Sequence, residues 1–203
     1  MNFLGHCLFS DQSPAALAGS LWPDFGLRPS EEASPIFLTH FDRHQAIDKF
    51  TDQCDELESI RQTLRPIFRK TSPLVIDLLI DHYLAKHWQT LHPVPLERFA
   101  NNCYQHLNQF KELPLSPRFE QTLFWMTEHD WFNAYAHSWG IERALKGMSR
   151  RIQFTTPLAR QAHQACALVA EYDGCFSDYL ASLTQHLNAQ DIVPGIKDLK
   201  KPD

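Results

Sequence analysis

The sequence predicts a single all-α domain, and two observations carry that prediction. The chain has only seven glycines among its 203 residues, and runs of β-branched residues are few. Its periodic stretches are rich in leucine, alanine, glutamine, glutamate and arginine, which favour helix over strand. Hydrophobic residues make up 43% of the chain, enough for one sizeable core at this length. No strand pattern, repeat or interdomain linker interrupts the helical pattern.

Prolines mark most of the expected helix starts. SPIFL at 34–38 and SPLVI at 72–76 each place a serine N-cap before a proline at the first helical position. HPVPLERF and LPLSPRFEQ indicate starts near 96 and 117, and TTPLARQAHQA indicates the last long helix. The expected helices are 12–21, 35–65, 73–90, 96–111, 117–128, 130–137, 139–151 and 156–188. The segment from about 190 onward is expected to be a frayed tail of this 1–203 domain.

Composition argues against several classes of protein. The formal charge of −5 gives no reason to expect nucleic-acid binding. No apolar run approaches the roughly 20 residues of a membrane span, and the N-terminal MNFLGHCLFS lacks a basic signal-peptide region. The cysteines are odd in number, form no CxxC pair, and predict reduced thiols in a cytoplasmic protein: Cys7, Cys54, Cys103, Cys166 and Cys175.

Ionisable side chains occur inside two stretches that otherwise read as core. Segment 73–90 is apolar nearly all round, so Asp81 in its middle should be buried. Asp77 and Asp81 share a helical face, and His82 lies about 100° from them. A buried carboxylate requires protonation, an ion pair or a metal, so an aspartate–arginine pair beside a satisfied core histidine is the alternative to a ligand set.

Segment 35–65 shows the same pattern. His40, His44 and Asp48 follow one another at four-residue steps beside an apolar stripe. A histidine and an aspartate one turn apart can bind the same ion, or the aspartate can fix the tautomer of a ligating histidine. A simple surface pair is the alternative. The N-terminal motifs NFLGH and GSLWPDF add His6 and Asp24. Pro23 is expected to push Trp22 out of helical geometry, which places Asp24 just past a helix end.

These residues together indicate a metal site within the first 90 positions. Mixed imidazole and carboxylate ligands suit manganese, magnesium or iron(II), whereas zinc is disfavoured because no cysteine shows ligand spacing. Such an ion activates water and neutralises phosphoryl oxygens. Such a site suits hydrolytic chemistry at phosphorus, and the residues alone therefore predict a metal-dependent hydrolase.

Four ordered motifs, MNFLGH, GSLWPDF, HQAIDKFTD and DHYLAKHW, resemble the bacterial acyl-carrier-protein phosphodiesterases, or holo-ACP hydrolases. The resemblance continues more weakly through WFNAY and ALKGMSRR, and so covers most of 1–151. It implies an HD-domain-like helical bundle, because that family is regarded as a divergent relative of the HD-domain phosphohydrolases. The chain departs from the family pattern at Ser20, at Trp22-Pro23 and at Leu8, which concerns the local turn and one supporting contact.

The resemblance also implies the reaction and its residues. The phosphodiester between 4′-phosphopantetheine and the acceptor serine of acyl carrier protein would be hydrolysed, with manganese the favoured metal. The expected ligands are His44, Asp81 and His82, completed by Asp24, and the expected catalytic residues are Asp48 and Asp24. Asp48 would orient His44 or act as a base. His6 and Asp77 are expected in supporting positions.

Acyl carrier proteins are strongly acidic, so a local basic surface is expected despite the net negative charge. Two helical stripes offer one, Arg143, Lys146 and Arg150 in one and Arg61, Arg65, Arg69 and Lys70 in the other. A solvated helix face is the alternative for each stripe. An aromatic-rich region is expected either to shape a groove for the pantetheine arm or to join the core: Trp125, Trp131, Tyr135 and Trp139.

Two other functions compete with this interpretation. An HD-type phosphohydrolase would act on a nucleotide or another small phosphodiester without a protein partner. A helical module that binds carrier protein and has lost its metal would neither retain nor require an ion. The sequence does not indicate an oligomeric state.

Overall fold

A computed structural model gives the arrangement of the chain and describes residues 1–26, 28–151 and 157–189. Every regular element in these ranges is helical, which confirms the all-α prediction. The α-helices are α1 (Phe3–Leu8), α2 (Pro14–Leu21), α3 (Pro35–Gln53), α4 (Glu58–Phe68), α5 (Ser72–Lys86), α6 (Trp88–Leu91), α7 (Leu96–Gln109), α8 (Pro117–Glu128), α9 (Trp131–Ala134), α10 (Ser138–Arg151), α11 (Ala162–Glu171) and α12 (Asp173–Ala189). Three 3₁₀ turns complete the set: η1 (Trp22–Phe25), η2 (Asp55–Leu57) and η3 (Arg69–Thr71).

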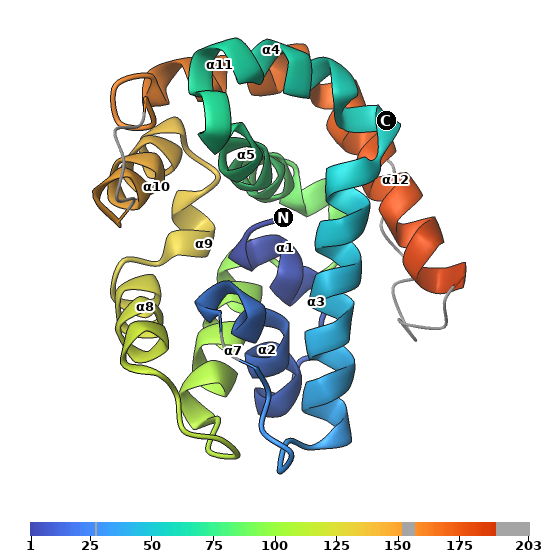
Figure 1. The fold of residues 1–203 in the computed structure, drawn as a ribbon, viewed down its shortest axis with the longest axis vertical. Helices are drawn as coiled ribbons and strands as arrows, with labels where there is room; N and C mark the ends of the chain where they lie inside the picture. Colours follow the sequence, from blue (N-terminus) through green and yellow to red (C-terminus); the bar gives the residue numbers. More distant parts are fainter. Residues whose placement is uncertain (27, 152–156, 190–203) are drawn as a thin grey trace.

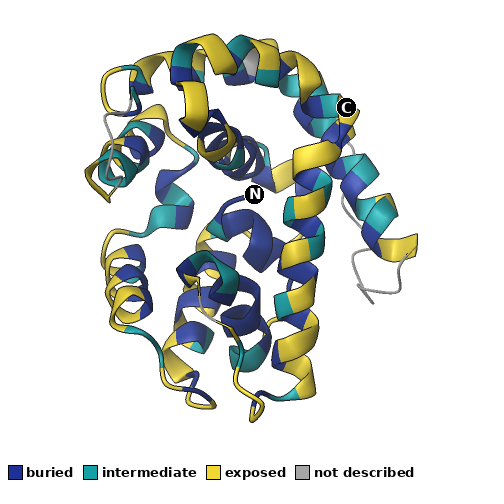
Figure 2. Cartoon of the chain, in the orientation of Figure 1, coloured by how far each residue is buried: buried dark blue, intermediate teal, exposed yellow. Residues whose placement is uncertain are grey.

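Helix α5 lies at the centre of the fold and packs against α1, α4, α10, α11 and α12 (Figure 1). Its apolar residues are buried nearly all round, as its sequence predicts, whereas α3, α4 and α8 each expose one face (Figure 2). Helices α2, α3 and α7 pack together as a second group of helices. The short α1 contacts both α5 and α2, so it lies between the helices around α5 and the group formed by α2, α3 and α7. Within the described residues, no helix combines the length and apolarity needed to cross a membrane.

Serine caps begin several helices as expected. The hydroxyl of Ser34 accepts a hydrogen bond from the amide of Phe37, and Ser116 accepts one from Phe119, each followed by proline at the first helical position. The expected cap at Ser72 is wrong. Helix α5 begins at Ser72 itself, and its N-cap Thr71 makes no side-chain cap.

The expected continuous helix 35–65 is wrong, because the chain breaks at Cys54. This residue has extended backbone angles, φ −69° and ψ 139°, and the chain restarts as α4 after the η2 turn. Helix ends leave carbonyls without partners. The Arg61 guanidinium takes that role, donating to the Cys54 carbonyl at 2.7 Å and to the Thr51 carbonyl. After the break, helix α4 packs against α5.

Three other boundaries also differ. The long helix expected at 156–188 is two helices, because Tyr172 leaves helical geometry and α12 restarts at Asp173. The helix expected at 73–90 ends at Lys86 and resumes as α6 beyond His87. The segment expected at 130–137 has only the four-residue helix α9. The frayed tail expected from about 190 lies outside the described residues, as does residue 156.

Helix α1 is absent from the sequence prediction. It has six residues and no side-chain cap of its own at Asn2, so local signals are weak. The HD-domain-like arrangement stays a prediction, since helical content alone does not test it.

Candidate metal centre

Two histidines and one aspartate converge where α1 approaches α3. His6 lies on α1, and His44 and Asp48 lie one turn apart on α3. Asp48 uses both oxygens, with Oδ2 2.9 Å from His44 Nε2 and Oδ1 3.2 Å from His6 Nε2. The two imidazole rings stack with centroids 3.7 Å apart and planes 12° apart. Each residue offers one ligand atom, and these atoms lie within 4.8 Å of one another.

His44 is oriented from the opposite side by Ser20, whose carbonyl lies 2.6 Å from its Nδ1 atom. That contact makes Nδ1 the donor, so a neutral ring presents a lone pair from Nε2 to the Asp48 carboxylate. A proton or a cation must lie between two such acceptors. Burial lowers the pKa of His44, but hydrogen bonding to Asp48 and the nearby charge of Asp24 outweigh it and raise the pKa. The environment therefore favours positive charge at this point.

The surroundings of His6 independently indicate a site for a cation. It is buried, and neither ring nitrogen has an aligned hydrogen-bond partner, although Nε2 lies close to Asp48. Burial and the neighbouring His44 lower the pKa of His6 to about 3, so the ring is neutral. Unpaired buried nitrogens are costly and uncommon. Two imidazole nitrogens beside a carboxylate are a donor set that fits a divalent cation.

Asp24 adds a second carboxylate whose charge acts on His44. It lies in η1, just after Pro23, and its Oδ2 atom is buried without a hydrogen-bond partner. The expectation that Pro23 takes Trp22 out of helical geometry is wrong, because Trp22 keeps helical angles, φ −57° and ψ −42°, and the chain continues directly into η1. Burial raises the pKa of Asp24 to about 6, although the charge of His44 opposes the shift. A carboxylate with that pKa can take up and release a proton near neutral pH.

The amino group of Met1 lies between Asp77 and Asp48, at 2.6 Å and 3.4 Å from one oxygen of each. Burial lowers its pKa, but the two carboxylates outweigh that effect and raise the pKa to about 10. Burial raises the pKa of Asp77 despite the amine. Burial alone would raise the pKa of Asp48 as well. His44 and His6 outweigh burial there and lower the pKa of Asp48 well below the ordinary value.

Asp81 and His82 have other partners. The two oxygens of Asp81 accept hydrogen bonds from the amides of Leu4 at 2.8 Å and Gly5 at 3.0 Å, which caps the first turn of α1. Burial raises the pKa of Asp81 to about 7 against the effect of these bonds. The Nδ1 atom of His82 lies 2.6 Å from the carbonyl of Tyr135, so His82 joins α5 to the end of α9.

The predicted residues are thus divided by the structure. His44 and Asp48 lie together as the four-residue spacing suggests, and Asp24 lies near them. His6, expected in support, stands beside His44. Asp81, expected as a ligand, accepts hydrogen bonds from the helix that carries His6, and its role as a ligand stays a prediction. The sequence prediction did not include α1. Without that helix, nothing in the sequence indicates that His6 faces α3.

The structure separates the two basic stripes. Lys146 on α10 forms an ion pair with Glu142 at 3.2 Å, and Arg143 and Arg150 are exposed on the same helix. Arg65 on α4 and Arg69 at its C-cap are exposed, and neither forms an ion pair with an acidic residue of the described chain.

The aromatic residues also divide. Tyr135 is buried, and its hydroxyl accepts a hydrogen bond from the side-chain amide of Asn2; Trp131 stacks on Phe3. Trp125 and Trp139 are 44% and 54% exposed. The first two therefore belong to the packed interior, while the last two are available at the surface.

Comparison with known proteins places this arrangement in a family. The sequence model described as "Acyl carrier protein phosphodiesterase" matches residues 1–183. The chain belongs to the acyl carrier protein phosphodiesterase family. Proteins of that name from Escherichia coli (strain K12 / DH10B) and Klebsiella pneumoniae (strain 342) are each 32% identical to it, over 154 and 159 residues. Each match covers 74% of this chain and 79% of the relative. No solved structure matches it.

The acyl carrier protein phosphodiesterase match includes every element of the candidate centre. The residues concerned, His6, Asp24, His44 and Asp48, all lie well inside 1–183. Both basic stripes lie inside it as well.

Proposed function

We propose that this protein hydrolyses the phosphodiester that joins 4′-phosphopantetheine to the acceptor serine of acyl carrier protein. The products are apo-acyl carrier protein and free 4′-phosphopantetheine. The observation that carries the proposal is the group formed by His6, His44 and Asp48, with the partly exposed Asp48 at its open side. Membership of the family supplies the substrate, since the relatives are named for it.

The same three residues are the proposed holders of one divalent cation, with manganese the first candidate and magnesium or iron the others. Such an ion lowers the pKa of a bound water and neutralises phosphoryl oxygens. Ser20 fixes the ring of His44, and Asp81 fixes the helix that carries His6, so both act through the ligands rather than on the substrate.

Asp24 is the proposed proton acceptor. Its buried, unpartnered oxygen and its pKa of about 6 suit a base that works near neutral pH, whereas the lowered pKa of Asp48 suits a permanent anion. Water adds to phosphorus, the bond from phosphorus to the serine oxygen breaks, and the proton taken from water replaces phosphorus on that oxygen. Charge and atoms balance with no further reactant.

All five cysteines are free in the structure. Free thiols are usual in a reducing compartment, so the proposed site of the reaction is the cytoplasm.

Incubation with holo-acyl carrier protein and manganese, followed by intact mass of the carrier, tests the function. Loss of the phosphopantetheine mass is expected, and Asp24→Asn should slow it by roughly 10²–10⁴-fold. An unchanged carrier mass at high enzyme concentration refutes the proposal. Turnover of nucleotides in the same preparation would then assign the site to small phosphodiesters.

A further inference from the structure

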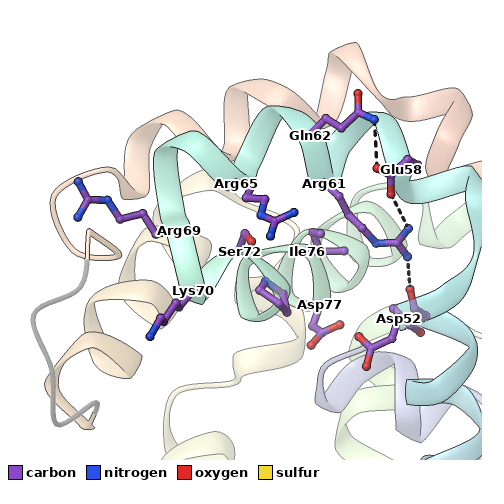
Figure 3. Close-up of a pocket in the computed structure, with 12 residues that line it drawn as sticks. Asp52, Glu58, Arg61, Gln62, Arg65, Arg69, Lys70, Ser72, Ile76 and Asp77 are labelled. Carbon is purple, nitrogen blue, oxygen red and sulfur yellow. Dashed lines mark hydrogen bonds and ion pairs between the residues drawn. The ribbon is translucent and has the colours of Figure 1, made fainter.

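A pocket of about 360 Å³ lies between the C-terminal end of α3, helix α4 with its η3 turn, and the first turns of α5 (Figure 3). Asp52 and Asp77 stand at one end, and Arg69 and Lys70 project at the other, with Arg65 between them. The pocket therefore has an acidic end and a cationic end.

The acidic end adjoins the candidate metal centre. Asp77 lines the pocket, and its Oδ1 atom lies 2.6 Å from the Met1 amine. The same amine lies 3.4 Å from Asp48, whose side chain is 43% exposed. The Met1 amine therefore links this end of the pocket to the carboxylate that lies between the two histidines.

The cationic end has charge that the fold does not use. Arg61 is committed to the carbonyls at the end of α3 and to Glu58. In contrast, Arg65, Arg69 and Lys70 are exposed, and none of them forms an ion pair with a carboxylate of the described residues. Arg69 also has φ 53° and ψ −127°, a backbone conformation that costs free energy in any residue but glycine. Strained residues of this kind cluster at binding sites.

We propose that this pocket is the docking site for the acidic surface of acyl carrier protein, with carboxylates of the carrier against Arg65, Arg69 and Lys70. The inference rests on the proposed function. The serine that carries 4′-phosphopantetheine then reaches the acidic end of the pocket, beside Asp77. Because the whole chain carries a net charge of −5, a local cationic cluster is needed to attract an acidic partner. The α10 stripe suits this role less well, since Lys146 is already paired with Glu142 on the same helix.

Binding of apo-acyl carrier protein tests the docking site without the scissile bond. We expect Arg65→Glu/Arg69→Glu to weaken binding to the manganese-loaded protein by at least roughly tenfold, or about 1.4 kcal/mol, at low salt. The salt dependence of the dissociation constant should fall, and KM for holo-acyl carrier protein should rise in parallel. Arg98→Glu/Lys111→Glu, which makes the same charge change at exposed positions elsewhere, is the matched control and should bind nearly as wild type.

Melting temperature with and without manganese shows that each variant is folded and loads metal. Unchanged affinity of the Arg65→Glu/Arg69→Glu variant overturns the docking site, as does an equal loss in the control. A larger loss in Arg143→Glu/Arg150→Glu moves docking to α10 and also overturns it. If only free 4′-phosphopantetheine loses affinity in the Arg65→Glu/Arg69→Glu variant, the pocket holds product rather than carrier, and the inference fails. Wild type that leaves holo-acyl carrier protein intact refutes the proposed function instead, whatever the variants bind.

Discussion

Asp81→Asn tests whether this buried carboxylate is a structural cap whose charge is costly. Asp81 is fully buried, and burial raises its pKa to about 7 from the ordinary 3.8. The folded protein therefore binds a proton that the unfolded chain releases between these two values, so this residue's contribution to stability falls as pH rises through the window. About two pH units of that window lie above pH 5. Over those two units the free energy of unfolding should fall by roughly 3 kcal/mol through this residue.

Asparagine removes the charge but leaves one of the Leu4 and Gly5 amides without an acceptor. That loss costs about 1–3 kcal/mol at any pH. At pH 5 the variant should be less stable than wild type, and by pH 8 the difference should shift by roughly 3 kcal/mol in its favour. In melting temperature the shift is about 6–12 °C for a domain of this size.

Urea or thermal unfolding of both proteins in chelator from pH 5 to pH 8 measures the difference. Other titrating groups are common to both proteins, so their effects largely cancel. A difference that stays constant across this range would refute protonation of Asp81 in the folded state. If the variant instead loses stability relative to wild type as pH rises, the folded state does not raise the pKa of Asp81.

Three further predictions concern metal, packing and strain. Saturating manganese, at about a thousand times its dissociation constant, should stabilise wild type by roughly 4 kcal/mol. His6→Ala and Asp48→Asn should each remove most of the resulting shift in melting temperature, and persistence in both would exclude the ligand set. Gly19→Ala would place a Cβ 2.3 Å from the carbonyl oxygen of Phe37; we expect a loss of about 1–3 kcal/mol in urea unfolding, and an unaltered midpoint would show that α2 can move. Arg69→Gly should raise stability by roughly 1 kcal/mol through relief of its positive φ, and a decrease would mean that the Arg69 side chain stabilises the turn.

Local signals in the sequence were sufficient for much of the fold. Serine followed by proline fixes helix starts at Pro35 and Pro117, because both the cap and the proline act within one turn. The apolar character of α5 likewise predicts its burial. The breaks at Cys54 and Tyr172 were not predictable in this way, since the apolar pattern continues through both. What ends α3 is Arg61, which reaches back from the following helix to the exposed carbonyls.

The candidate centre shows the same limit. His44 and Asp48 share a helix, so their proximity follows from a spacing of four residues. The argument that buried Asp81 needs a partner was sound, but its partners are the amides of Leu4 and Gly5, more than seventy positions away. Periodicity carries no information about such contacts. His6 depends on them in turn.

Helix α1, with six residues, is too short to persist as an isolated segment. It owes its existence to a side chain of α5, so one of the two histidines is positioned only when the central helix is in place. Occupancy by an ion and cooperativity of unfolding should therefore be linked across the molecule. A peptide carrying MNFLGH would bind metal no better than any short histidine peptide. A substitution that loosens α5 at the end far from α1 should weaken metal affinity before it unfolds the protein.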